Sequence, residues 1–393
     1  MSHHNPAFEA VFGHPARYLF SAPGRTELSG NHTDHQNGCV LAASVDLESL
    51  AWVAENGSAV IRVQSEGYPL CEVALDDLEK KDSEINTTAA LVRGVAAKFV
   101  ELGAALAGFD AYVTSTVLPG SGLSSSASFE VLMGCVINHL FHGGKCSPVE
   151  IAQIGQFAEN VYFGKPSGLM DQTACAVGGV IAIDFADSKA PVVKKADFDF
   201  AAFGHALCII DSCASHADLT DEYAAIPQEI KKVSALFGKD VLRDIPEADF
   251  YARIGEARAA AGDRAVLRCI HFYEENRRVQ QQVAAIEAGD FDTFLRLTSQ
   301  SGRSSWMYLQ NVIPAGRKEH QEMAFALALA EKLLGGRGAV RVHGGGFAGT
   351  LLAFVPNDML DTFKEEIETV LGNGTCHVLS IRENGCCLVE ELV

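Results

Sequence analysis

One stretch constrains the fold of this chain more than any other: residues 118–128, which read LPGSGLSSSAS. A β-rich segment at 111–117 precedes it and an apolar run with helical spacing at 131–140 follows it, so we expect a strand, a loop and a helix. Gly120 and Gly122 let the backbone approach a ligand, the serines add hydroxyl donors, and the helix start adds a positive dipole end. The stretch favours an anion site suited to phosphates. A turn that only caps the helix is the alternative.

Strand-like and helical segments alternate along the whole chain. Further strands are expected at 180–185, 206–210 and 350–355. Helices are expected at 92–102 behind Thr87 or Thr88, at 151–161 behind Ser147 and Pro148, and at 360–370 behind Asn357 or Asp358. This mixture predicts an α+β or α/β class. No linker or repeat marks a boundary, so we expect domains that share a close interface.

Charge and composition exclude several classes of partner. The formal net charge of −19 repels polyanions, which argues against nucleic acid or an anionic bilayer as the main partner. No apolar run approaches the length of a membrane-spanning helix and the N-terminus lacks signal-peptide features, so we expect a cytoplasmic protein. The 11 cysteines are scattered without zinc-site spacing, which predicts reduced and mostly buried thiols.

A second informative stretch, residues 22–41, reads APGRTELSGNHTDHQNGCVL. It concentrates hydrogen-bonding side chains in a turn-rich segment, which is costly unless something polar binds there. Its acceptors and ring nitrogens suit the hydroxyls of a polyol. A metal site on His32, Asp34 and His35 is the weaker interpretation because no further ligand lies nearby in the sequence. A solvated loop is the third.

Two more stretches carry weaker signals. Residues 167–173, SGLMDQT, place Asp171 shortly after the helix that carries Glu159, where a lone acid is most often a cap or a surface carboxylate. Residues 341–350, RVHGGGFAGT, contain G-x-G-x-x-G. A β-like run instead of a helix follows these glycines, which favours a tight turn over a dinucleotide site.

Taken in order, the four stretches resemble the motifs of the GHMP small-molecule kinases, and among them those of the galactokinases. The resemblance runs from about Ala22 to beyond Thr350, with GRTELSGNHTDHQNGCVL, GSGLSSSAS, AENVYFGKPSGLMDQ and VHGGGFAGT as the matching segments. It implies a two-lobed α+β fold with the active site in the cleft between the lobes. Residues 1–178 would form the N-terminal lobe, with the first two motifs and Asp171, and residues 179–393 the C-terminal lobe.

The resemblance also implies roles for individual residues. The loop would wrap the ATP phosphates with Gly120, Ser121, Gly122, Leu123, Ser124, Ser125 and Ser126. Ser126, or Ser125, and Glu159 would hold Mg²⁺. Asp171 would face the anomeric hydroxyl of a sugar, with Arg25 beside it, either as a base or as part of a pair that positions and neutralises. The sugar contacts would be Asn31, His32, Asp34, Gly168, Asp171 and Tyr223.

The implied function is ATP-dependent phosphorylation of the C1 hydroxyl of galactose or a closely related monosaccharide, by a monomer. Two departures concern the sugar, because relatives read GEHTDY where this chain has Asn31 and His35 in GNHTDH. The segment TSQSGRSSWMYLQN at 298–311 also lacks the family's usual serine and acidic pattern. Two alternatives stay open: a sensor that binds sugar and ATP without turnover, and a kinase for a different aldose or a sugar acid.

Overall fold

The structure, a computed structural model, describes residues 4–117, 122–196, 198–215 and 219–392. The chain folds into two units. Unit 1 comprises Met1–Arg25, Ala43–Gly179 and Ile381–Val393, and unit 2 comprises Thr26–Ala42 and Val180–Ser380. We expected one boundary after residue 178, and one break between the units does fall between Gly179 and Val180. Two segments depart from that expectation, because residues 26–42 group with the C-terminal half and residues 381–393 with the N-terminal half.

The main sheet of unit 1 has the strand order β12-β1-β2-β5-β3-β4. Its strands are β1 (Tyr18–Ser29), β2 (Cys39–Glu55), β3 (Val60–Ser65), β4 (Cys71–Ala74), β5 (Phe109–Ser115) and β12 (Cys387–Glu391). β1 continues from unit 1 into unit 2, and β2 returns to unit 1. The C-terminal strand β12 pairs antiparallel with the start of β1, with Tyr18 opposite Glu391, which explains why the C-terminus belongs to unit 1.

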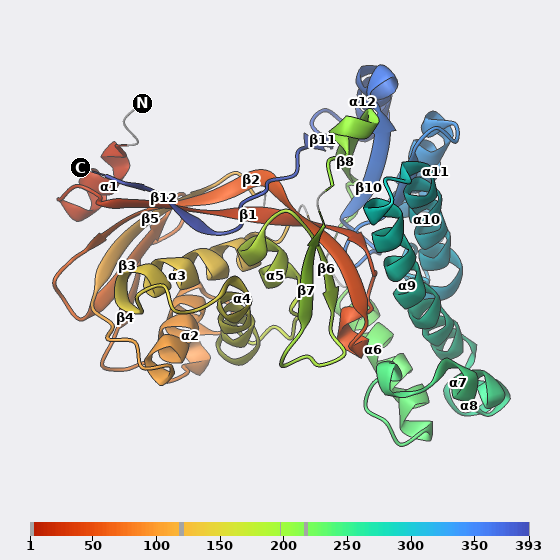
Figure 1. Cartoon of the computed structure of the whole chain (residues 1–393), viewed down its shortest axis with the longest axis horizontal. Coiled ribbons are helices and arrows are strands. Elements are labelled where there is room, and N and C mark those ends of the chain that lie inside the picture. Colours follow the sequence, from red (N-terminus) through yellow and green to blue (C-terminus); the bar gives the residue numbers. More distant parts are fainter. Residues whose placement is uncertain (1–3, 118–121, 197, 216–218, 393) are drawn as a thin grey trace. The chain divides into compact units, whose positions relative to one another are not determined.

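Helices cover one face of this sheet (Figure 1). They are α2 (Thr88–Glu101), α3 (Ser125–Phe141), α4 (Pro148–Phe157) and α5 (Met170–Val177), with the π-helical turn η3 (Ala158–Phe163) following α4; α1 (Pro6–Phe12) packs on β5. Apolar side chains of α2, α3 and α4 form a core with the sheet, including the fully buried Phe20, Phe99 and Phe109. Burial of this surface is the main stabilising contribution to unit 1.

Unit 2 is built on a small antiparallel sheet of order β11-β8-β10-β9. Its strands are β8 (His205–Asp211), β9 (Ala339–Val342), β10 (Thr350–Pro356) and β11 (Cys376–Leu379), while β6 (Val180–Asp184) pairs with β7 (Val192–Ala196) and with β2. The helices are α6 (Thr220–Leu236), α7 (Glu247–Ala252), α8 (Ile254–Ala261), α9 (Asp263–Glu287), α10 (Phe291–Ser304), α11 (Glu322–Leu334) and α12 (Leu360–Leu371). α11 and α12 share a core with this sheet, and α9 packs against α6 and α10.

Most elements expected from the sequence are confirmed. β5, β6, β8 and β10 match the expected strands, and α2, α4 and α12 match the expected helices. Thr87 and Ser147 cap their helices through side-chain oxygens, Ser147 within a capping box. The cap expected at Asn357 or Asp358 is wrong: both lie in the 3-10 turn η7 (Asn357–Met359), and α12 starts after it without a side-chain cap.

Two further expectations concern the whole chain. The cysteines are all free, and five of them are buried, Cys39, Cys175, Cys208, Cys269 and Cys376. Within the part of the chain that the structure describes, no helix combines the length and the apolarity needed to cross a membrane.

Candidate active site

The glycine- and serine-rich loop of unit 1 leads into helix α3, as the sequence predicts. α3 begins at Ser125, and Ser124 precedes it in the left-handed conformation with φ 58°. A left-handed residue other than glycine is strained, and such strain often occurs at ligand-binding turns. Leu123 is fully buried, and its carbonyl oxygen accepts from Arg25 N at 3.2 Å. Gly120 and Ser121, two residues expected to contact phosphate, lie outside the described residues.

Arg25 and Asp171, distant in sequence, form a bidentate ion pair in unit 1. Arg25 Nε donates to Asp171 Oδ1 at 2.7 Å, and Nη2 donates to Oδ2 at 2.6 Å. The loop joins this pair, because Gly122 O accepts from Arg25 Nη1 and Ser124 Oγ donates to Asp171 Oδ2. The Arg25 side chain is 7% exposed and that of Asp171 is 33% exposed, so solvent or a ligand can reach the carboxylate.

The environment of Asp171 fixes its charge. Burial raises the pKa of this carboxyl, but the Arg25 guanidinium and the Ser124 hydroxyl outweigh burial and hold the pKa at about 2. Asp171 is therefore ionised at neutral pH. A carboxylate with such a low pKa is a weak base.

A second carboxylate, Glu159, lies on the π-helical turn η3 and is 2% exposed. Four side chains donate to it: Ser126 Oγ at 3.2 Å, Lys165 Nζ at 2.9 Å, Ser167 Oγ at 2.6 Å and Gln172 Nε2 at 2.9 Å. The first two bond Oε1 and the last two bond Oε2. The structure thus brings together Ser126 and Glu159, the two residues expected to hold Mg²⁺.

These residues fit a magnesium ion. Mg²⁺ in kinases is bound by one or two protein oxygens together with phosphate oxygens, and Ser126 and Glu159 supply a hydroxyl and a carboxylate. The Lys165 ammonium on Glu159 Oε1 shows that a cation is accommodated at this oxygen. No group of three or more His, Cys, Asp or Glu side chains in the described chain is placed to hold a metal. Phosphate oxygens of the nucleotide would be the remaining ligands of such an ion.

Glu130 is a buried acid that the sequence analysis missed. It lies on α3 with 0% exposure, and Gln172 Nε2 bonds both Glu130 Oε2 and Glu159 Oε2 at 2.9 Å. Burial and the nearby charge of Glu159 raise the pKa of Glu130 well above its usual value. The raised pKa favours the neutral, protonated form of Glu130 beside the Glu159 carboxylate. An acidic residue directly before the apolar run at 131–140, at a position expected to be helical, was the available signal.

The segment expected to bind the sugar belongs to unit 2, where Asn31 is 0% exposed. Asn31 Nδ2 donates to Glu27 Oε1 at 3.0 Å and to Gly344 O at 2.5 Å. Its Oδ1 accepts from Asn311 Nδ2 at 2.9 Å and from Ser305 Oγ at 3.4 Å. We expected Asn31 to contact the sugar. The Asn31 amide donors and oxygen are bonded within unit 2, so Asn31 holds its neighbours in place, and its contact with the sugar stays a prediction.

Asn311 and Ser305 come from the stretch at 298–311 that departs from the family pattern. Glu27, which accepts from Asn31, also accepts from an arginine. Arg341, 0% exposed, donates to Glu27 Oε1, which already accepts from Asn31. The buried set therefore contains one carboxylate, one guanidinium and two amides. An acid at position 31, as in relatives, would add a second carboxylate to this set.

Helix α9 anchors the backbone of the same segment. Glu275 Oε1 accepts from Gly30 N at 3.1 Å, His271 Nε2 bonds Asn31 O at 3.0 Å, and Asn276 Oδ1 accepts from Cys39 N at 2.7 Å. Burial raises the pKa of Glu275, but Arg278, His271 and other donors outweigh burial and hold it at about 2. An ionised buried carboxylate thus fixes the start of the loop. No local sequence pattern predicts these contacts, because more than 200 residues separate the partners.

His32 and Tyr223 meet at the glycine turn of unit 2. His32 Nε2 bonds Gly345 O at 3.0 Å, and Tyr223 Oη donates to Gly346 O at 3.0 Å. A Cβ on Gly345 would lie 2.7 Å from the Tyr223 ring, so only glycine permits this approach. Burial and then the charge of His35 lower the pKa of His32 to about 4. The ring is neutral, and because Nε2 donates to a carbonyl, its Nδ1 is an acceptor.

The remaining predicted residues are half-buried. Asp34 opens the 3-10 turn η1 (Asp34–Gln36), with its side chain 13% exposed and Oδ1 accepting from His35 N at 2.9 Å. Gly168, in unit 1, lies between Ser167 and the start of α5. Both are accessible enough to contact a ligand.

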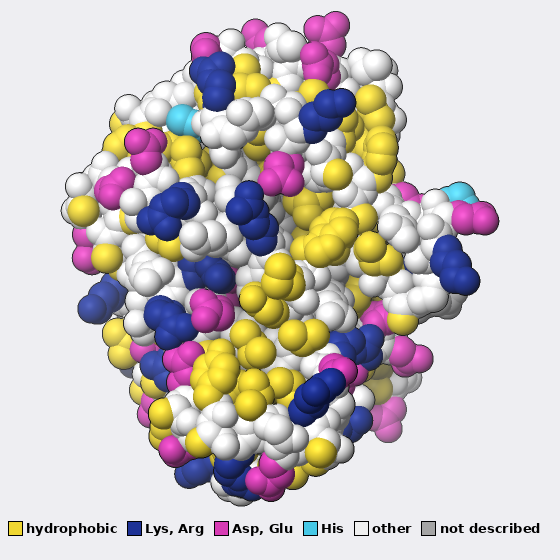
Figure 2. Space-filling view, turned by 90° about the vertical axis from the view of Figure 1, so that its right-hand side faces the viewer, with side chains coloured by type: hydrophobic (Ala, Val, Ile, Leu, Met, Phe, Trp, Pro, Cys, Tyr) yellow, Lys and Arg dark blue, Asp and Glu magenta, His cyan; other side chains and the backbone are white. Residues whose placement is uncertain are grey.

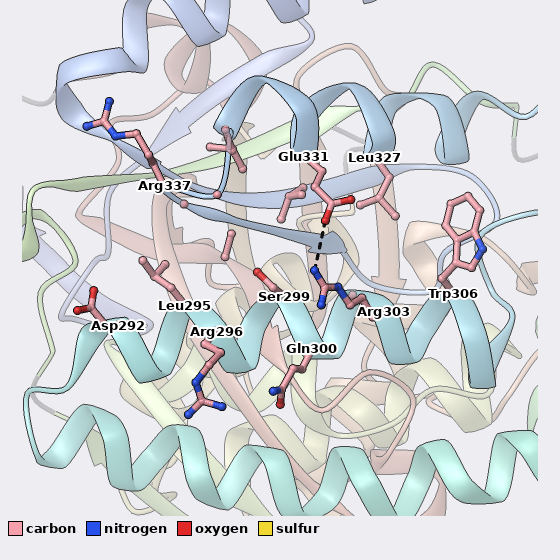
Figure 3. Close-up of a pocket in the computed structure, with 16 residues that line it drawn as sticks. Asp292, Leu295, Arg296, Ser299, Gln300, Arg303, Trp306, Leu327, Glu331 and Arg337 are labelled. Atoms are coloured by element: carbon pink, nitrogen blue, oxygen red, sulfur yellow. Dashed lines mark ion pairs between the residues drawn. The ribbon is translucent and has the colours of Figure 1, made fainter.

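A hollow of about 740 Å³ lies elsewhere in unit 2, between α10, α11 and β9. Arg303 of α10 and Glu331 of α11 point toward each other across it, 3.8 Å apart (Figure 3). The residues that line it include none predicted to bind sugar or phosphate.

On the face shown in Figure 2, hydrophobic side chains gather in the middle and charged side chains lie around them.

Comparisons with known proteins identify the family and the fold. Residues 90–179 match the family described as GHMP kinases N terminal domain, and residues 6–55 match the galactokinase galactose-binding signature. The galactokinase of Streptomyces coelicolor is 30% identical over 364 residues, which cover 92% of this chain and 90% of that protein. The crystal structure of Lactococcus lactis galactokinase complexed with galactose matches with a TM-score of 0.82 and 26% identity, over 97% of both chains. Mevalonate kinase of Methanococcus jannaschii shares the fold, with a TM-score of 0.65 and 14% identity over 93% of this chain and 98% of that chain.

The chain belongs to the GHMP kinase family, whose members use ATP. It is a galactokinase-like sugar kinase with the mixed α+β fold of that family, and it carries the galactose-binding signature.

Proposed function

We propose that this kinase transfers the γ-phosphoryl group of ATP to the C1 hydroxyl of galactose or a closely related monosaccharide. The observation that carries the proposal is the Arg25–Asp171 pair, which is bonded to the loop at Gly122 and Ser124. This arrangement links the carboxylate expected to face the sugar with the loop expected to hold the phosphates. Phosphoryl transfer asks the protein chiefly for such alignment and for stabilisation of charge.

The pKa of Asp171, about 2, favours different roles for Asp171 and Arg25. Asp171 accepts a hydrogen bond from the sugar hydroxyl and orients it, and it accepts the proton only as the hydroxyl oxygen loses electron density to phosphorus. Arg25 keeps the carboxylate ionised and contributes positive charge beside the transferring group. This favours positioning and neutralisation over early proton removal.

Ser126 and Glu159 would hold Mg²⁺ together with the ATP phosphates. The ion, when bound, neutralises charge on the phosphates. Glu159 is buried, and the neutral donors Ser126, Ser167 and Gln172 orient its carboxylate for this role.

For the sugar, we propose contacts from His32, Asp34, Gly168 and Tyr223. His32 offers a neutral ring acceptor and Asp34 a carboxylate, a combination that suits neighbouring hydroxyls. Asn31 also acts on the sugar indirectly, through the loop that it holds. The catalytic set is intact, and this favours turnover over a sensor role.

A coupled assay of ADP release with a panel of aldoses and sugar acids tests the proposal. We expect ADP release that depends on galactose or a close analogue, and near-complete loss in Asp171→Asn, with Asp76→Asn on the exposed surface of unit 1 as the matched control. ATP binding without sugar-dependent turnover would support the sensor. Wild-type turnover in Asp171→Asn would remove Asp171 from the mechanism.

A further inference from the structure

Lys165 has a defined place beside Glu159, although no motif singles it out. Gly164 ends the π-helical turn with φ 88°, and the backbone N–H groups of Gly164 and Lys165 both donate to Glu159 O, at 3.0 and 3.1 Å. The turn therefore folds Lys165 back over Glu159, and its Nζ reaches Glu159 Oε1 at 2.9 Å. The lysine side chain is 59% exposed, whereas the glutamate side chain is 2% exposed.

The Lys165 ammonium supplies the positive charge that balances the buried Glu159 carboxylate. Ser126, Ser167 and Gln172 are neutral donors, so among the described residues Lys165 is the cation that pairs with Glu159. Asp171 has its own cation, Arg25. Lys165 also acts electrostatically on Asp171, and the charge of Asp171 acts on Lys165. It thus lies near both predicted functional carboxylates of unit 1.

The metal proposed for this site and Lys165 compete for the same oxygen. Ser126, a proposed metal ligand, donates to Glu159 Oε1 through its hydroxyl group. The Lys165 ammonium donates to the same oxygen. A dication on that oxygen repels an ammonium 2.9 Å away from it. The ammonium would then be released on a flexible four-carbon stem, and half its side chain or more is already in solvent.

We propose that Lys165 is a phosphate-binding residue of the kinase: in the nucleotide-free chain its ammonium neutralises Glu159, and in the ATP complex it donates to a phosphate oxygen. This inference rests on the proposed function. An ammonium is a compact donor that suits phosphate oxygens. Ser126, which follows the glycines of the loop expected to bind phosphate, donates to the same Glu159 oxygen as Lys165. Lys165 thereby keeps a buried carboxylate paired in the nucleotide-free chain and supplies positive charge to the nucleotide in the complex.

Calorimetric titration of ATP into the nucleotide-free protein tests this, with and without Mg²⁺. Lys165→Met keeps the length of the side chain and removes the charge, Lys165→Arg keeps the charge, and Lys145→Met is the matched control on an exposed turn of unit 1. Loss of a charge-assisted hydrogen bond should weaken ATP binding by about 10- to 100-fold in Lys165→Met with Mg²⁺ present. Lys165→Arg and the Lys145 control should bind within about threefold of wild type.

Two measurements separate the outcomes. If Lys165 serves only to pair Glu159, Lys165→Met melts at a lower temperature and its ATP Kd stays at the wild-type value, which overturns the proposal. If the variant does not fold, the wild-type protein is treated with an amine-acylating reagent and analysed by mass spectrometry. ATP with Mg²⁺ should then slow modification of Lys165 and leave Lys145 unchanged, and equal slowing or none would overturn the proposal. A wild-type protein that binds no ATP would instead contradict the proposed function.

Discussion

Replacing Asn31 with aspartate should unfold or strongly destabilise this protein, although the two side chains have the same shape. The amide group donates to Glu27 Oε1 at 3.0 Å and to Gly344 O at 2.5 Å, in a site with 0% exposure. An aspartate has no hydrogen to donate when ionised. Its oxygen would face a carboxylate and a carbonyl.

The cost follows from the distance. Two unit charges 3.0 Å apart repel by about 5 kcal/mol at an effective dielectric constant of about 20. Protonation of one of the two acids would relieve part of this repulsion. It costs about 1.4 kcal/mol for each unit by which the solution pH exceeds the pKa of that acid. We therefore expect Asn31→Asp to lower the free energy of unfolding by about 3 to 5 kcal/mol at pH 7.

The partner substitution should compensate. Glu27→Gln alone leaves the buried Arg341 without its carboxylate, which also destabilises. In the double variant Glu27→Gln/Asn31→Asp, one acid and one amide exchange places, so an amide donor faces a carboxylate again. We expect a favourable coupling of at least about 2 kcal/mol between the two positions.

Urea denaturation of wild type, both single variants and the double variant at pH 7 gives this coupling directly. Asn373→Asp, on an exposed turn of unit 2, controls for the added charge and should change stability by less than about 0.5 kcal/mol. A stable Asn31→Asp protein, or additive effects in the cycle, would refute the reasoning that residue 31 is a buried partner of Glu27.

Three other predictions concern acids with unusual pKa values and the metal site. Glu130→Gln should keep or raise the melting temperature at pH 7, because the raised pKa already favours the neutral form of this acid in the folded protein; a clear loss of stability would mean it is ionised. The pKa of Glu275 is depressed to about 2, so its contribution to the stability of the folded protein is present above about pH 4.5 and disappears as the pH falls through 2. Glu275→Gln should thus destabilise at pH 7 and flatten the acid side of a urea-denaturation pH profile, and an unchanged profile would contradict this. Ser126→Ala with Glu159→Gln should raise the Mg²⁺ concentration needed for ATP binding more than it alters sugar binding, as titration calorimetry would show; an unchanged Mg²⁺ requirement would remove both from the metal site.

Local sequence patterns predicted local structure well in this chain. The glycine and serine loop begins α3 at Ser125 as expected, because a strand, a turn and an apolar helical run are all short-range signals. The same holds for the caps at Thr87 and Ser147. The π-helical turn at Ala158–Phe163 could not be predicted, because apolar spacing does not distinguish one widened turn from an α-helix.

Contacts between distant segments were beyond sequence reasoning. No local pattern predicted that Asn311, 280 residues later in the chain, would donate to the oxygen of Asn31. The return of residues 381–393 to unit 1 depends on pairing of β12 with β1, which no local pattern encodes. The resemblance to GHMP kinases singled out Arg25 and Asp171, but the depressed pKa of Asp171 required the geometry of both.

The central claim is that a phosphoryl group passes from ATP to the C1 oxygen of a galactose-like sugar. Phosphorus and proton NMR of a reaction with wild-type protein, galactose, ATP and Mg²⁺ tests it most directly. We expect a new phosphate signal coupled to the anomeric proton of the sugar, formed in equal amount to ADP, and absent with Asp171→Asn. A phosphate on another carbon, or ADP formed with free phosphate and unmodified galactose, would contradict it.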